Sequence, residues 1–232
     1  MSWRTNPITI QVRSLARTIG LTSLIGNLIQ GDRYEQAFDD AMFANINPGD
    51  VVWDVGANIG YYSRKFAESA TPGGQVFAFE PFPETIRKLT EQVSDHSGIT
   101  IVPVALGSEP GEMAMEEGGD ELGATNRVVA GPAGESGHIV EIARGDTLVD
   151  TGKVQMPNAI KIDTEGFELD VLRGITNLLK MPDLRALFVE VHFGNLAERG
   201  MPHAPAELEA LLSKSGFSLN WVDPSHVVAL RS

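Results

Sequence analysis

Apolar runs alternate with amphipathic segments along most of the chain. The runs are nearly continuous in apolar residues, as in "RALFVEV", which is typical of strands buried on both faces. They predict five strands, at residues 51–54, 75–79, 100–104, 159–163 and 186–193. Segments with apolar residues at helical spacing follow four of them, at residues 61–69, 84–93, 168–179 and 206–215. This succession predicts a parallel sheet with helices on both faces.

Two regions depart from this alternation. Residues 105–158 are rich in glycine, and "GHIVEIARG" alternates apolar and polar residues, which predicts an inserted hairpin or extended arm with mobile loops before the fourth strand. The final segments "GFSLNWV" and "HVVALRS" predict two strands joined by a turn at 223–225. A mostly parallel sheet that ends in an antiparallel hairpin is typical of the class I methyltransferase fold, which is Rossmann-like. We expect one such domain over residues 34–232.

Residues 1–33 form a separate N-terminal segment with apolar residues at helical spacing. We expect a helix that docks on the domain. The alternatives are a lid over the active site, a targeting segment, or a helix that docks on a partner or a membrane surface. Arg13 and Arg17 interrupt any run long enough to span a bilayer, so we expect no transmembrane segment.

Composition and charge exclude several classes of function. The 232 residues carry a formal charge of −13, which argues against a general nucleic-acid binder because phosphate affinity rests mainly on Lys and Arg. The chain has no cysteine, which excludes disulfides, zinc–thiolate sites and thiol nucleophiles. We find no convincing secretion signal, so a cytoplasmic location is the default expectation. The sequence does not indicate the oligomeric state.

The stretch "VVWDVGANIGYYSRKF" places a glycine-containing turn directly after the first strand. Asp54 lies at the carboxyl end of that strand, where ligands bind in open α/β sheets. Gly56 and Gly60 allow a sharp turn and a close approach to a ligand, and the amides near residues 57–59 suit a carboxylate at a helix N-terminus. The turn has neither a G-x-G-x-x-G pattern nor a Gly-Lys-Ser/Thr ending. A tight strand–helix turn without a ligand is the alternative.

An acidic residue at the end of the second strand points to a nucleoside ligand. In "VFAFEPFPE", Glu80 lies 26 residues after Asp54, and its carboxylate suits both hydroxyls of a ribose. A ribose site without a pyrophosphate cradle fits S-adenosylmethionine. Ala105 and Leu106 offer an apolar wall for the adenine. Glu35 lies before the first strand, where a helix would either fold over the cofactor or simply pack on the domain. The candidate cofactor-binding residues are therefore Glu35, Asp54, Gly56, Ala57, Asn58, Gly60, Glu80, Pro81, Ala105, Leu106 and Asp163.

A second set of polar residues lies at the ends of the fourth and fifth predicted strands. In "IKIDTEGFE", Lys161 and Asp163 share one face of the strand, and Glu165 follows on the turn. In "FVEVHF", Glu190 and His192 share a face near the strand's end. These five residues are the candidate catalytic residues. The alternatives are helix capping by Asp163 and a buried histidine–acid pair.

Methyl transfer to an alcohol requires alignment and removal of a proton. His192 is the best-suited base near neutral pH, whereas Lys161 would first need a depressed pKa. A divalent metal such as Mg²⁺, Ca²⁺ or Mn²⁺ is another way to acidify the acceptor, and its ligands would be Asp163, Glu165, Glu190 and His192. The same four groups would suit a sugar-binding site, so the sequence does not require a metal.

Several of these motifs together resemble the FkbM-type S-adenosylmethionine-dependent methyltransferases. The segments are "GDVVWDVGANIGYYS", "VFAFEPFPE" and "AIKIDTEGFELDVLRG", with "YEQAF" before and "LFVEVH" after them, and they cover residues 34–192 in order. The resemblance implies a class I fold and methyl transfer, commonly to a hydroxyl oxygen of a small molecule, sugar or natural product. The alternatives are an N- or carboxyl-methyltransferase on the same fold, or a nucleoside-binding module without turnover.

Overall fold

The structure is a computed structural model that describes residues 31–116, 127–128 and 137–231. The predictions for the N-terminal segment therefore lie almost entirely outside the described residues. Part of the predicted insertion, between residues 117 and 136, also lies outside them except for residues 127–128.

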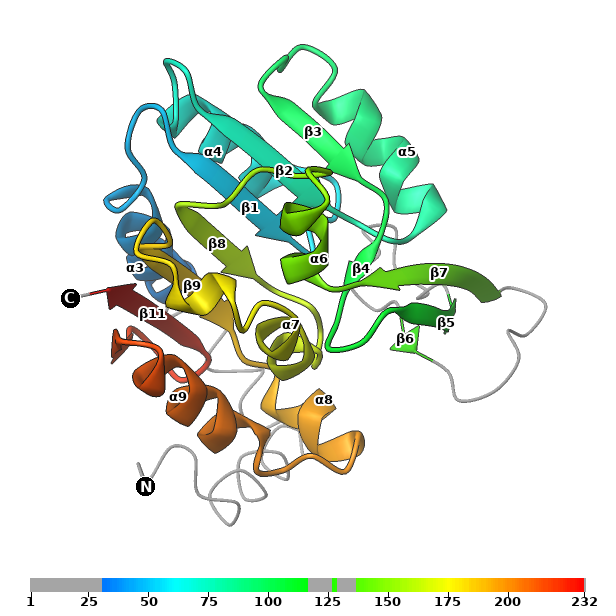
Figure 1. Cartoon of the computed structure of the whole chain (residues 1–232), viewed down its shortest axis with the longest axis vertical. Coiled ribbons are helices and arrows are strands. Elements are labelled where there is room, and N and C mark those ends of the chain that lie inside the picture. Colours follow the sequence, from blue (N-terminus) through cyan, green and yellow to red (C-terminus); the bar gives the residue numbers. More distant parts are fainter. Residues whose placement is uncertain (1–30, 117–126, 129–136, 232) are drawn as a thin grey trace.

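Within the described residues, seven strands form the main sheet, in the order β10-β11-β9-β8-β1-β2-β3 (Figure 1). The strands are β1 Val51–Val55, β2 Gln75–Phe79, β3 Ile99–Val102, β8 Ala159–Ile162, β9 Ala186–Glu190, β10 Phe217–Trp221 and β11 His226–Arg231. The five from β9 to β3 are parallel, and β11 is antiparallel to both β9 and β10. This arrangement confirms the predicted fold class.

Helices cover both faces of the sheet (Figure 1). On one face lie α3 Gly31–Phe43, α4 Tyr61–Ser69 and α5 Pro83–Gln92. On the other lie α6 Gly145–Asp150, α7 Glu168–Gly174, the 3₁₀ turn η1 Leu178–Lys180 and α9 Ala204–Lys214. The short helix α8 Phe193–Glu198 follows β9. No helix in the described part of the chain is long and apolar enough to cross a membrane.

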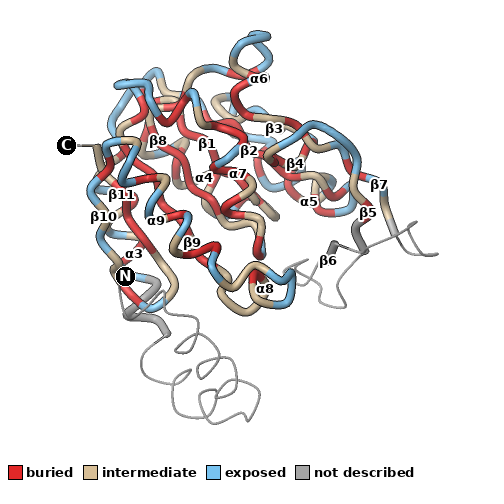
Figure 2. Tube along the Cα trace, turned by 60° about the horizontal axis from the view of Figure 1, so that its bottom comes forward, coloured by how far each residue is buried: buried red, intermediate tan, exposed pale blue. Residues whose placement is uncertain are grey.

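The core divides into two layers because strand residues alternate between the faces. Trp53, Ile160 and Leu187 pack toward α7 and α9, while Val52 and Phe188 pack toward α3 and α4. Every residue of β8 is buried, Lys161 included, as expected of a central strand covered on both faces. Figure 2 shows the buried strands in the centre of the domain, with the exposed positions on the helices and loops around them.

The insertion forms a second sheet beside the first. Its strands are β4 Ala105–Leu106, β5 Gly111–Glu116, β6 Arg127–Val128 and β7 Gly137–Ala143, in the order β4-β7-β5-β6. β5 and β7 are antiparallel, which confirms the β-structure predicted in this region. The sequence pattern did not predict α6, which follows β7 directly.

Several predicted boundaries differ from the structure by one or two residues, two differ by three or more, and one of these two matters for the site. The fifth strand was predicted to reach residue 193, but β9 ends at Glu190 and α8 begins at Phe193. His192 therefore lies at the N-terminus of a helix rather than in a strand. The helix predicted at 168–179 ends at Gly174, and η1 follows after a turn.

Candidate active site

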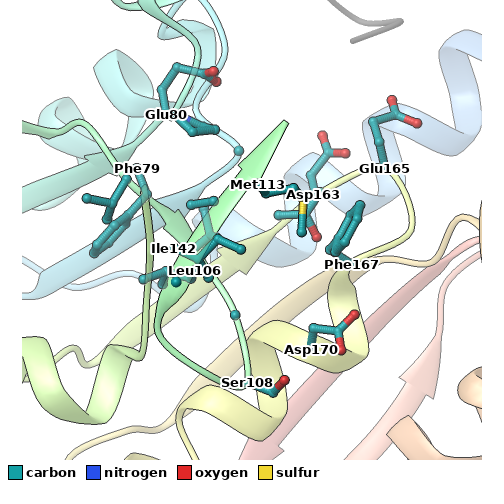
Figure 3. A pocket seen from close by; sticks show the side chains of 18 of the residues that line it. Phe79, Glu80, Leu106, Ser108, Met113, Ile142, Asp163, Glu165, Phe167 and Asp170 are labelled. Atoms are coloured by element: carbon teal, nitrogen blue, oxygen red, sulfur yellow. The ribbon is translucent and has the colours of Figure 1, made fainter. Parts of the chain in front are cut away.

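A cavity of about 930 Å³ opens at the carboxyl edge of the main sheet, where the second sheet meets it. This volume suits a cofactor-sized ligand. Figure 3 shows Glu80 at one side of the cavity and Asp163 and Glu165 at the other. The structure therefore brings members of both groups of predicted polar residues, Glu80 from one and Asp163 and Glu165 from the other, to one cavity.

Glu80 is the buried acid at the nucleoside end of the cavity. Its side chain accepts a hydrogen bond from the Asn58 amide at 3.0 Å through Oε2 and one from the Phe82 amide at 3.0 Å through Oε1. Each oxygen keeps a second lone pair, so both still suit a ribose diol. Burial raises the pKa of Glu80 to about 7, although the two amides oppose this shift.

The glycines of the turn are required for packing against the protein itself. Gly56 has φ +81°, and a Cβ there would lie 1.9 Å from the main-chain oxygen of Asp163. Gly60 has φ +89°, and a Cβ there would lie 2.6 Å from Leu89 Cδ1. Gly56 lines the cavity and Gly60 does not. The sequence interpretation assigned both glycines to ligand approach, whereas the structure gives them neighbours within the fold.

The amides of the same turn are already engaged. Gly56 and Ala57 both donate to the main-chain oxygen of Phe79, at 3.1 and 3.0 Å, and the Asn58 amide binds Glu80. A ligand carboxylate was predicted to bind these amides. The amides of Ala57 and Asn58 already donate to protein acceptors. The Asn58 side chain lines the cavity, and its buried Oδ1 has no hydrogen-bond partner among the described residues. That oxygen suits a donor such as an ammonium group.

Asp54 is fully buried and does not line the cavity. Its Oδ2 accepts a hydrogen bond from Ser63 Oγ at 2.6 Å, which ties β1 to α4. Lys161 Nζ lies 3.6 Å from its Oδ1. The sequence interpretation listed Asp54 among the cofactor-binding residues, whereas its contacts in the structure are with Ser63 and Lys161.

Apolar residues form the wall between the two ends. Ala105 and Leu106 line the cavity as predicted, and Pro81 lines it beside Glu80. Met113 of β5 and Ile142 of β7 complete this wall (Figure 3). Sequence reasoning did not select Met113 and Ile142. Only the strand pairing of the second sheet shows that these residues reach the cavity. The Glu35 side chain lies outside the described part of the structure.

Lys161 lies beneath the acidic end of the cavity and is buried. Its ammonium group lies 3.2 Å from Asp163 Oδ2 and 4.9 Å from the ring centre of Tyr62. Burial lowers the pKa of Lys161, but Asp163 and Asp54 raise it above its usual value overall. Lys161 thus fails the condition for a base and serves as a buried counter-ion. For Asp163, burial raises the pKa, but Lys161 and His192 lower it below its usual value overall.

His192 lies among carboxylates. Its Nδ1 is 2.9 Å from Oε1 of Glu168, while Nε2 lies 3.3 Å from Glu165, 3.7 Å from Glu190 and 3.8 Å from Asp163. Burial lowers the pKa of His192, but Glu168, Glu165 and Asp163 raise it to about 9 overall. The sequence placed Glu168 only in the first turn of a helix and missed it as the partner of His192.

The turn that carries Glu165 is braced by α8. Glu165 has the left-handed φ of 50°, and the Asn195 amide nitrogen donates to its main-chain oxygen at 3.1 Å and to Oε2 at 2.9 Å. Arg199 donates to the main-chain oxygen of Gly166 and lies over the Phe167 ring at 3.6 Å. Burial raises the pKa of Glu165, with His192 opposing the shift. Sequence reasoning missed Asn195 and Arg199 because it predicted no helix between the strand that it ended at residue 193 and the helix at 206–215.

A second histidine adjoins the cluster. His226 Nε2 lies 3.3 Å from Glu190 Oε2, and its Nδ1 lies 2.6 Å from Asp223 Oδ2. Burial lowers the pKa of His226, and the two acids raise it to about 9. His226 pairs with Glu190 in the register of β11 and β9, so only the sheet topology could have found it. Glu190 and His192 do not line the cavity, but His192 contacts Asp163 and Glu165, which do.

Sequence comparison identifies relatives for most of the chain. The Methyltransferase FkbM domain family matches residues 54–219. The hexuronic acid methyltransferase AglP of Haloferax volcanii is 36% identical over 164 residues, which cover 70% of this chain and 64% of that protein, a little less than two thirds. The 31-O-demethyl-FK506 methyltransferase FkbM of Streptomyces tacrolimicus is 29% identical over 220 residues, which cover 80% of this chain and 81% of that protein.

Solved structures share the fold at low sequence identity. The methyltransferase FkbM from Methylobacillus flagellatus superposes with a TM-score of 0.52 and 14% identity, over 78% of this chain and 43% of that one. Fibrillarin from Aeropyrum pernix, solved with bound S-adenosylmethionine, gives a TM-score of 0.50 and 13% identity, over 83% of this chain and 74% of that one. These similarities support the fold assignment.

Proposed function

Because the chain belongs to the FkbM methyltransferase family, we propose that it transfers a methyl group from S-adenosylmethionine to an oxygen of a small hydroxylated acceptor such as a sugar. The observation that carries this proposal is the cavity that joins Glu80 to Asp163 and Glu165. One end offers a nucleoside site, and the other offers polar groups for an acceptor beside it.

The residues at the first end fit S-adenosylmethionine. Glu80 keeps free lone pairs for the ribose hydroxyls, and Leu106 and Ile142 give the adenine an apolar wall. The unpartnered Oδ1 of Asn58 suits the ammonium group of the amino-acid end. When bound, the cofactor supplies a methyl group on a sulfonium and leaves as S-adenosylhomocysteine.

At the second end, this chain must hold an acceptor oxygen in line with the methyl–sulfur bond. Asp163 and Glu165 line the cavity there and accept hydrogen bonds from a hydroxyl or a sugar ring. The acceptor oxygen forms a bond to the methyl carbon as the carbon–sulfur bond breaks, its electron pair remains on sulfur, and the hydroxyl proton has to leave.

We assign that proton to Glu165 rather than to His192. With a pKa of about 9, His192 is protonated at neutral pH and has no lone pair for a second proton. Glu165 lines the cavity, and burial raises its pKa. His192 instead holds positive charge beside the acceptor site.

A carboxylate acceptor is the second candidate. The name of the Haloferax volcanii relative gives a hexuronic acid as its substrate, and such a sugar offers both hydroxyl and carboxylate oxygens. The name of the Streptomyces tacrolimicus relative gives an O-demethylated substrate, which favours a hydroxyl. Acidic residues at the acceptor end favour a neutral acceptor over an anionic one unless a cation is bound there.

The first test is calorimetric titration with S-adenosylmethionine, S-adenosylhomocysteine and NAD. We expect both adenosyl ligands to bind and NAD not to bind. Glu80→Ala and Glu80→Gln should weaken binding by about 10- to 150-fold, which corresponds to about 1.5–3 kcal/mol for lost charge-assisted hydrogen bonds. The control is Glu84→Ala, which removes an exposed acid of α5. Binding of NAD alone, or equal affinity in all variants, would contradict the cofactor assignment.

A further inference from the structure

The two nitrogens of His192 face different surroundings. Nδ1 points at Glu168, whose side chain is fully buried, whereas Nε2 points toward Asp163 and Glu165, which line the cavity. The imidazole is therefore anchored on its buried side and presents its other nitrogen to two carboxylates.

The distances at that nitrogen fit one shared ion. One ligand atom from each of Asp163, Glu165 and His192 lies within 4.8 Å of the others. Nε2 is 3.3 Å from the Glu165 oxygen and 3.8 Å from the Asp163 oxygen. Ligands that bind one ion at about 2.1 Å with angles of 90–109° lie roughly 3.0–3.4 Å apart, so small side-chain rotations close the set.

Glu168 supplies an independent observation. Its Oε1 accepts hydrogen bonds from the Gly166 amide at 2.7 Å and from His192, while its buried Oε2 has no hydrogen-bond partner among the described residues. Positive charge next to a buried carboxylate with few hydrogen-bond partners is stabilising, and His192 is the group that contacts it. Metal-binding histidines almost always donate their other N–H to such a carboxylate, which fixes the tautomer and the ring orientation.

We propose that Asp163, Glu165 and His192 form a binding site for a divalent cation of the Mn²⁺ or Mg²⁺ type, with its remaining positions open to the cavity. Two carboxylates and one imidazole, in a chain without cysteine, suit a hard or borderline ion. Ca²⁺ takes six to eight oxygen ligands and fits this small set less well. Glu190, the fourth ligand considered from sequence, is bound to His226 instead.

The position of the site gives the ion a role at the acceptor end of the cavity. This role rests on the proposed function. An acceptor oxygen bound to the ion would be more acidic and oriented toward the donor end of the cavity. The ion would also offset the acidic lining and so admit an anionic sugar. Without the ion, Nε2 of His192 faces the Asp163 and Glu165 carboxylates directly.

Metal binding is measured directly, without turnover. Purified protein is titrated with Mn²⁺ in 0.15 M salt by calorimetry and by the loss of the free-ion electron paramagnetic resonance signal. The variants are Glu165→Gln, which keeps the hydrogen bond to Asn195, and Glu198→Gln, which removes the same charge from another residue lining the cavity. S-adenosylmethionine binding is titrated in parallel with and without a chelator.

We expect one Mn²⁺ per chain, with affinity reduced at least about 10-fold in Glu165→Gln and unchanged in Glu198→Gln. No binding by the folded wild-type protein would overturn the proposal. An equal loss of Mn²⁺ affinity in both variants would also overturn the proposal, because such a result indicates nonspecific attraction to acidic residues. Cofactor binding without Mn²⁺ binding would overturn the metal site alone, whereas failure of cofactor binding would overturn the proposed function.

Discussion

Replacement of Gly56 by alanine tests how the two ends of the cavity are joined. Gly56 has φ +81°, and its new Cβ would lie 1.9 Å from the main-chain oxygen of Asp163. Left-handed backbone costs a residue with a Cβ about 1–2 kcal/mol, and forcing extra volume into a packed site typically costs about 1–3 kcal/mol more. We expect the free energy of unfolding to fall by about 2–5 kcal/mol in Gly56→Ala.

Gly49→Ala is the matched control. Gly49 has a similar φ of +88°, but a Cβ there has nothing within 4 Å, so only the backbone term applies. Urea unfolding of both variants and the wild type separates the two contributions. Gly56→Ala should also weaken cofactor binding because its clash displaces Asp163, whereas Gly49→Ala should not. Equal destabilisation of the two variants, within about 0.5 kcal/mol, would refute the close contact as the reason for glycine.

Two further predictions concern stability. The folded-state pKa values of His192 and His226 are raised to about 9, so their stabilisation is complete below pH 6.5 and is lost as the pH rises through 9. Each shift corresponds to roughly 3 kcal/mol, so Tm should fall between pH 7 and 9.5, and a flat profile would contradict the charge pairing. Asp146→Ala should lower the free energy of unfolding by about 2–4 kcal/mol, because the buried carboxylate accepts the amides of Asn177 and Leu178. Calorimetric titration of this variant should show unchanged cofactor affinity, and a large loss would mean that η1 supports the cavity.

Much of the fold could be predicted because its strands are short, nearly continuous apolar runs separated by segments with helical spacing. An acid also follows the carboxyl end of the second and fourth predicted strands, so the sequence alone places Glu80 and Asp163 at one edge of the sheet. The end of β9 could not be placed. "FVEVHF" alternates like a strand, but the amide of Val191 donates to Ser225 in the terminal hairpin, and α8 then begins.

The partners of the catalytic candidates could not be predicted from local pattern. Glu168 resembles an ordinary first-turn acid of a helix, and only the tertiary fold buries it against His192. His226 comes 36 residues after Glu190 and reaches it through antiparallel register. No periodic pattern or fixed spacing in a single sequence indicates either contact.

The contact between Gly56 and Asp163 has a consequence for redesign of this enzyme. Gly56 approaches the main-chain oxygen of Asp163 so closely that the two strand ends meet main chain against main chain. Under the proposed function, substitutions at Met113 or Glu198 on the cavity wall should therefore alter the shape available to the acceptor without moving this contact. New acceptors are best sought by varying the wall rather than the turn.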